Sequence, residues 1–199
     1  MAEVAQVLTI SAVVLLVGNA FLLLLSRDWR WTLLSLGAQF LLAFWMISRS
    51  WPLELAAVKL VGGWMATAVL GLTLLNQLDA PPESESLPSS RPFLAMAAAL
   101  VIVIVSGVSP ELSTWSRQLD ASVTWSGLFL IGIGLLQVGM SASLFRSALG
   151  LLTLLSGFEI LYAALETSIL VAGLLAFLSL GVALAAAYLM LTPSMEAEQ

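Results

Sequence analysis

The sequence predicts an all-α integral membrane protein with about seven transmembrane helices, and three observations support this fold class. Of the 199 residues, 60% are hydrophobic and only 10% are charged. A soluble domain of this length cannot be built with so few charges, because it has a large surface to cover with polar groups. The hydrophobic residues stand in long runs, which is the signature of membrane spans. The connections between the runs are too short to hold a soluble domain.

The expected helices follow the apolar runs in chain order. The runs are Val7–Leu25, Thr32–Ile47, Leu53–Leu75, Phe93–Val108, Val123–Met140, Leu144–Leu165 and Ser168–Leu191. The first run lacks the basic leader of a signal peptide, so we expect a span there. The second and fourth runs are short for a span of about 20 residues, so their helices should extend into the flanking polar residues.

One Pro/Ser/Glu-rich connection divides the chain. It predicts an N-terminal three-helix segment (1–76), a polar linker (77–92), a C-terminal four-helix segment (93–192) and an acidic tail (193–199). A second, mildly polar connection is expected at Ser109–Ser122, because it contains Pro110.

The arginines predict the orientation. Arg27, Arg30, Arg91 and Arg146 fall on one side of the expected spans, and Arg49 and Arg117 on the other. By the positive-inside rule, the N-terminus is then outside and the C-terminus is cytoplasmic.

Absent residue types exclude several functions. The chain has neither cysteine nor histidine. Disulfides, Cys/His zinc sites, thiolate-held iron–sulfur clusters and His-ligated haem are therefore excluded, and we expect no cofactor. No basic patch indicates nucleic acid binding.

Glu159 stands within the apolar run Leu144–Leu165, whose other charged residue, Arg146, lies near its start. A charged group at a helix centre costs about 2.5 kcal/mol or more, so such residues are usually functional. Glu159 comes 13 residues after Arg146, which places it ~20 Å along the helix axis. It could instead be a static partner that fixes helix packing.

Lys59 is expected at a similar depth on another helix. It lies five residues inside the third span from Glu54, or ~8 Å. An acid and a base at one level in low dielectric invite pairing, so we predict that Lys59 and Glu159 approach one another within a proton path. Alternatively, Lys59 snorkels to the interface. Tyr162, one turn after Glu159, is the nearby hydroxyl that could extend a hydrogen-bond chain.

Other polar and small residues in the spans predict packing. Asn19, Gln39 and Gln137 are expected to form interhelical hydrogen bonds. Glycines of the fifth and sixth runs are expected to form close-packing faces: Gly127, Gly134, Gly150 and Gly157.

The last three runs carry a family resemblance. Gly127–Met190 contains a hairpin with Arg146 at its turn, then Gly157-Phe158-Glu159-Ile160-Leu161, then an alanine-rich helix. This segment resembles the K subunit of bacterial complex I and the C subunit of multisubunit cation/proton antiporters. The whole chain resembles component E of hydrogenase-4-type complexes, in which an early helix carries a lysine, as in Ala57-Val58-Lys59-Leu60-Val61.

The resemblance implies a K-like module over about residues 123–192, with Glu159 on a proton path and Arg146 at a basic turn. It also implies larger antiporter-like membrane subunits as partners, in a bacterial plasma membrane or thylakoid. The last run contains no second acid, which the K subunit has, and the turn has a single arginine.

Two classes of function remain open. The first is a cofactor-free membrane subunit of a complex I-like, membrane-hydrogenase-like or antiporter-like assembly, which handles protons and does not function alone. It has no catalytic site of its own, so any oxidoreductase activity belongs to the complex. The alternative is a structural membrane adaptor that holds larger subunits together. A small independent transporter is less favoured, because no inverted repeat or broken helix is evident.

Overall fold

The computed structural model describes residues 2–26, 28–76, 91–115, 120–141 and 143–196, and the regular structure in these ranges is helical. The helices are α1 (Ala2–Leu25), α2 (Trp29–Ile47), α3 (Leu53–Asn76), α4 (Arg91–Trp115), α5 (Ala121–Met140), α6 (Leu144–Leu165) and α7 (Ile169–Glu196). Each of the seven is long and apolar enough to cross a membrane. The predicted all-α fold, with seven helices long and apolar enough to span a membrane, is confirmed, whereas the K-like module stays a prediction. The expected linker, except its last two residues, lies outside the described ranges.

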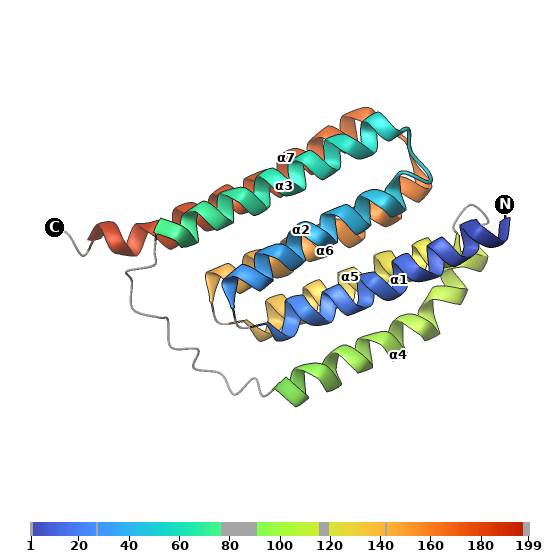
Figure 1. Ribbon diagram of the computed structural model, residues 1–199, viewed down its shortest axis with the longest axis horizontal. Coiled ribbons are helices and arrows are strands. Elements are labelled where there is room, and N and C mark those ends of the chain that lie inside the picture. Colours follow the sequence, from blue (N-terminus) through green and yellow to red (C-terminus); the bar gives the residue numbers. More distant parts are fainter. Residues whose placement is uncertain (1, 27, 77–90, 116–119, 142, 197–199) are drawn as a thin grey trace.

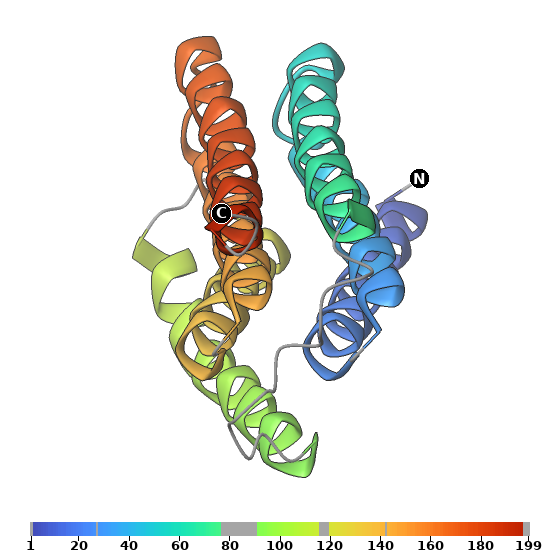
Figure 2. The same ribbon diagram turned by 90° about the vertical axis from the view of Figure 1, so that its left-hand side faces the viewer.

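Two helices continue past a proline, and the expected start of one connection was wrong. The connection expected at Ser109–Ser122 is helical up to Trp115, because α4 continues through Pro110. The tail expected from residue 193 is likewise helical up to Glu196, and 197–199 lie outside the described ranges. A proline removes one hydrogen bond, but its fixed φ is close to the helical value, so it can kink a helix without ending it. Figure 2 shows the last turns of α4 bending away from its main axis.

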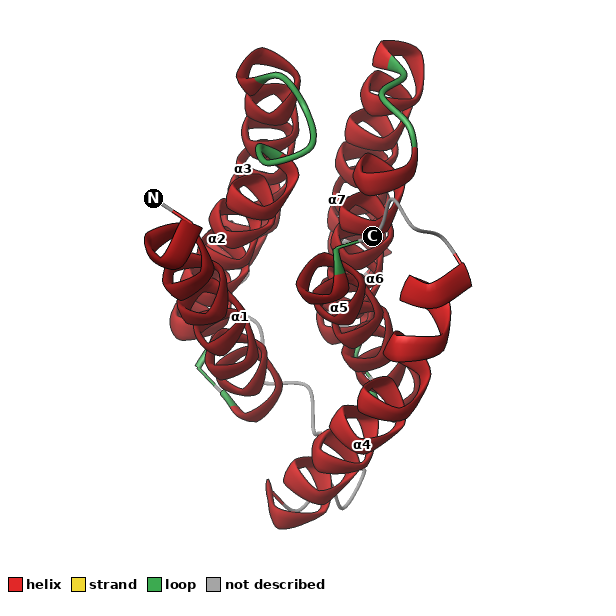
Figure 3. Cartoon of the chain, turned by 90° about the vertical axis from the view of Figure 1, so that its right-hand side faces the viewer, coloured by secondary structure: helices red, strands yellow, loops and turns green. Residues whose placement is uncertain are grey.

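The helices form two layers (Figures 2 and 3). One layer contains α1, α2 and α3, and the other contains α4, α5, α6 and α7. Across the layers α3 packs on α7, α2 on α6, and α1 on α5. The two layers therefore correspond to the chain before and after residues 77–90.

Glycines bring α5 and α6 into backbone contact. A Cβ atom added at Gly157 would lie 2.6 Å from the Gly127 carbonyl oxygen, and one added at Gly134 would lie 2.7 Å from the Gly150 carbonyl oxygen. Real Cβ atoms are not found so close to backbone, so only glycine permits this approach. The expected close-packing faces are confirmed.

The molecule has two distinct ends along its helix axes. We call the end that carries Arg30 and Arg146 the basic end, and the other, at the α2–α3 connection, the Trp51 end. The chain termini lie at opposite ends in Figure 1. A chain that crosses from end to end an odd number of times must begin and finish at opposite ends.

Candidate functional site

Lys59 of α3 and Glu159 of α6 form a buried ion pair between the two layers. Lys59 Nζ lies 2.6 Å from Glu159 Oε1. The two residues are 5% and 4% exposed. This is the one salt bridge within the described ranges. The predicted contact between Lys59 and Glu159 is confirmed, whereas their role stays a prediction.

Small residues on α3 allow its close approach to the neighbouring helices beside Lys59. A Cβ atom added at Gly63, one turn after Lys59, would lie 2.3 Å from the ring of Phe40 on α2. At Gly62 the Cβ would lie 3.3 Å from Ala176 Cβ on α7. The glycine pair therefore lets α3 pack closely against α2 of its own layer and against α7 of the other layer, and Lys59 lies between the layers.

The pair lies closer to the Trp51 end than to the basic end. Glu159 precedes Leu165, the last residue of α6, by six residues, or ~9 Å along the axis. Trp51 is buried at this end, and its Nε1 donates a hydrogen bond of 2.9 Å to the Glu166 carbonyl oxygen. The indole thereby links the α2–α3 connection to the end of α6, at the end of the molecule that is nearer to the ion pair.

A serine that the sequence reasoning missed completes the site. Ser179 of α7 is 3% exposed, and its Oγ lies 3.4 Å from Glu159 Oε1. The same hydroxyl also lies 3.0 Å from the Leu175 carbonyl oxygen of its own helix, so its single proton can be donated to either acceptor, one at a time. Ser179 is the one serine in the apolar span Ile169–Thr192 of α7, which marks it as unusual, but its own sequence does not show that it faces Glu159.

The predicted Tyr162 makes aromatic contacts. Its ring packs edge-on against Trp51, with centroids 6.3 Å apart, and beside Phe158, at 6.2 Å. In the described part of the chain its hydroxyl has no hydrogen bond to Lys59 or Glu159. Tyr162 therefore belongs to the aromatic cover at the Trp51 end, and its relay role stays a prediction.

Arg146 is distant from the pair. Its Nη2 donates a 3.0 Å hydrogen bond to the Ser26 carbonyl oxygen at the end of α1. Ser143, the N-cap of α6, accepts a hydrogen bond from the Arg146 backbone N–H. The basic turn thus anchors the α5–α6 hairpin to the α1–α2 connection, ~20 Å from Glu159 along the axis.

Buried polar side chains occupy the interior between the pair and the basic end. Asn19 Nδ2 donates a 2.8 Å hydrogen bond to the Ser35 carbonyl oxygen, which confirms the bond between helices expected for Asn19. For Gln39 and Gln137 this expectation was wrong: both side chains are buried and unpaired among the described residues. The hydroxyls of Ser35 and Thr153 are buried and unpaired in the same way.

Contacts between the helices place these groups at similar levels along the helix axes. The bond from Arg146 to Ser26 and the bond from Trp51 to Glu166 align α2 with α6, so that Gln39 is near the level of Thr153. On α5, Gln137 precedes Val138, whose N atom would lie 2.9 Å from a Cβ at Gly150. Along the helix axes, the unpaired groups of α2, α5 and α6 therefore lie within about two helical turns of one another. Buried polar groups are nearly always hydrogen-bonded in proteins, so such a set requires an explanation.

Comparisons of the chain with protein-family models, with curated proteins and with solved structures find no match. The resemblance to the K subunit and its relatives therefore stays a proposal.

The arrangement is suited to acid–base chemistry. A carboxylate, an ammonium and a hydroxyl meet in a position shielded from solvent. The described residues contain no group of three or more acidic residues that could hold a metal ion.

Proposed function

We propose that this chain is a cofactor-free membrane subunit of a larger proton-translocating assembly, in which Lys59 and Glu159 form one station of the proton path. The observation that supports this proposal most directly is the buried ion pair, with its Nζ–Oε1 distance of 2.6 Å. Desolvating two charges costs several kcal/mol per ion, and their attraction does not always repay this cost. Apolar side chains of similar volume would pack these helices equally well. The presence of two buried charges is therefore better explained by a function of the charges than by their contribution to stability.

The chemistry follows from the two charge states of the pair. When the ammonium proton moves to the carboxylate, the charged pair becomes a neutral amine and a neutral acid, and neither of these carries the cost of a buried charge. The acid can then release its proton, and the amine can take up another. Ser179 can stabilise the carboxylate during this exchange, because its hydroxyl lies 3.4 Å from Oε1.

The buried amides and hydroxyls support a route from the basic end. Ser35, Gln39, Gln137 and Thr153 have polar atoms that are unpaired in the described part of the chain. Buried polar groups of this kind are commonly bridged by internal water, which also conducts protons. In the proposed route these groups hold water between the basic end and Glu159.

The proposed assembly follows the resemblance stated above. The partners are larger antiporter-like membrane subunits, and residues of about 123–192 act as the K-like module. The basic end faces the cytoplasm by the positive-inside rule, which leaves the N-terminus outside. The membrane is a bacterial plasma membrane or a thylakoid.

The test is a substitution that removes the titrating group and keeps its shape. The tagged chain is purified with its partners in mild detergent, and the assembly is reconstituted in liposomes to measure proton uptake with a pH-sensitive dye. We expect Glu159→Gln to lower the stability of the chain, because Lys59 then lacks its charged partner, and the purified Glu159→Gln assembly to lose proton translocation. Glu54→Gln is the matched control, because Glu54 is an exposed acid at the start of α3.

The structural adaptor is the alternative outcome of the same experiment. The direct contact of Lys59 and Glu159 favours the adaptor function, because a permanent ion pair can fix the packing of the helices. If the Glu159→Gln assembly translocates protons as fast as the wild type, the proton-path proposal is wrong and the adaptor function stands.

A further inference from the structure

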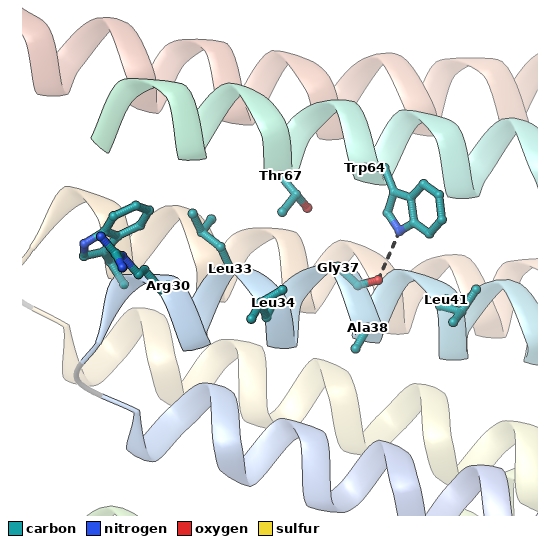
Figure 4. A pocket seen from close by; sticks show the side chains of 9 residues that line it. Arg30, Leu33, Leu34, Gly37, Ala38, Leu41, Trp64 and Thr67 are labelled. Carbon is teal, nitrogen blue, oxygen red and sulfur yellow. Dashed lines mark hydrogen bonds between the residues drawn. The ribbon is translucent and has the colours of Figure 1, made fainter. Parts of the chain in front are cut away.

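A groove of about 510 Å³ lies along α2 and α3. Figure 4 shows it between the two helices, with Arg30 near one end and Trp64 and Leu41 near the other. Its walls are formed by residues of α2 between Trp29 and Leu41 and by Trp64 and Thr67 of α3. The volume is within the range of about 300–1,000 Å³ that small-molecule sites occupy.

The walls are apolar except at one end. The polar groups of Gly37, Trp64 and Thr67 are already used: Trp64 Nε1 donates to the Gly37 carbonyl oxygen at 3.2 Å, and the Thr67 hydroxyl donates to the Gly63 carbonyl oxygen at 2.9 Å. Arg30 is the charged residue of the lining. Its guanidinium carbon lies 5.3 Å from the centroid of the Trp29 ring. The groove is therefore an apolar slot with a cation at the basic end.

The length of the groove distinguishes its possible occupants. From Trp29 to Leu41 the lining advances 12 residues along α2, or ~18 Å. This is close to half of the ~30 Å hydrocarbon core. The slot thus begins at one membrane interface and ends near the bilayer midplane. A transmembrane helix of a partner would need a groove across the full core, whereas one lipid chain needs one leaflet.

We propose that this groove is a binding site for an anionic glycerophospholipid of the leaflet at the basic end. One acyl chain lies along Leu33, Gly37 and Leu41, and the phosphate is bound by Arg30. Guanidinium groups bind phosphate with paired hydrogen bonds, and basic pockets between membrane helices select anionic head groups. The proposal is independent of the proton path, because it uses none of the residues of the ion pair.

The test is lipid retention by the purified full chain in native mass spectrometry, with phosphatidylglycerol or phosphatidylcholine of equal chain length. We expect the wild type to retain phosphatidylglycerol preferentially. Arg30→Gln should weaken this retention about fivefold, the effect of one basic side chain near anionic lipid, and Arg30→Lys should restore most of it. Water-soluble glycerol phosphate should not bind, because it lacks the acyl chain that fills the slot.

A second variant fills the groove itself. Gly37→Leu should abolish retention of both lipids, since a Cβ at Gly37 meets nothing within 4 Å and the side chain enters the groove. Gly139→Leu is the matched control, because a Cβ at Gly139 of α5 also meets nothing within 4 Å. Equal retention of the two lipids by the wild type, or no effect of Arg30→Gln, would overturn the proposal. So would a photoreactive side chain at Ala38 that crosslinks to a protein chain in native membranes.

Discussion

Lys59 and Glu159 depend on one another, and single substitutions should reveal this. Removing the partner of a buried charge is strongly destabilising, by about 3–5 kcal/mol, whereas replacing both charges by apolar groups is often neutral or stabilising. We expect Lys59→Met to unfold at a clearly lower temperature than the wild type in detergent. The double variant Lys59→Met/Glu159→Leu should recover most of this loss. The measurement is thermal unfolding followed by tryptophan fluorescence.

The comparison of single and double variants separates a true pair from two independent residues. If the effects of the two substitutions simply add, the charges are not coupled in the folded protein. Because Lys59 Nζ and Glu159 Oε1 are 2.6 Å apart, we expect strong non-additivity.

The two hydroxyls near Glu159 should contribute unequally. Ser179 Oγ lies 3.4 Å from the carboxylate, whereas Tyr162 packs against Trp51 and Phe158. A hydrogen bond to a charged group is worth about 1.5–3 kcal/mol, so Ser179→Ala should slow proton translocation by about tenfold. Tyr162→Phe keeps the ring contacts and should leave the rate unchanged. Loss of translocation in the Tyr162→Phe assembly would instead assign the relay to the phenol.

The site was only partly predictable from residue identities. The shared depth of Lys59 and Glu159 follows from counting residues along two helices, so their contact could be expected. Ser179 could not be assigned, because the neighbour of a helix in space is not determined by its own sequence. The orientation of the Tyr162 ring depends on Trp51 of a distant connection, which no spacing within α6 indicates. The lack of partners around Gln39 and Gln137 is likewise a property of the assembled interior.

At the scale of elements, the α5–α6 contact depends on glycine. A Cβ at Gly157 would lie 2.6 Å from the Gly127 carbonyl oxygen and 2.7 Å from the Ile131 N atom. The two backbones must separate to admit it, and overpacking of this kind costs about 1–3 kcal/mol. We therefore expect Gly157→Ala to lower the unfolding temperature in detergent.

Gly139→Ala is the control for this substitution, because it adds the same methyl group to α5 where nothing lies within 4 Å. It should unfold at the wild-type temperature. Equal unfolding temperatures for Gly157→Ala and the wild type would show that the helices tolerate separation, and that the glycines do not determine this contact.

The helices themselves were largely predictable, because the spans are determined by hydrophobic length alone. Prolines were the exception. Pro110 suggested a connection, yet α4 runs past it to Trp115, and α7 runs past Pro193 to Glu196. The fixed φ of proline is close to the helical value, so a helix can continue past it with one missing hydrogen bond. A proline alone therefore does not locate the end of a helix.

At the scale of the whole molecule, two layers of helices face each other along their length, and the charged pair joins them. Lys59 comes from the layer of α1–α3 and Glu159 from the layer of α4–α7. Any relative movement of the layers must lengthen or shorten this contact. If the proposed partner subunit binds one layer, it can therefore act on the pair without touching it.

The orientation in the membrane can be tested directly, because the natural chain contains no cysteine. Ser50 is exposed at the Trp51 end, and Asn76 is exposed where α3 finishes at the opposite end. In the proposed orientation, a membrane-impermeant maleimide should label Ser50→Cys in intact cells. Asn76→Cys should be labelled only after the membrane is opened. Seven spans require that the two positions differ, since α3 crosses the bilayer between them. Labelling in the reverse order would keep the fold and invert the direction of the proposed proton route, because the polar interior would then open to the outside.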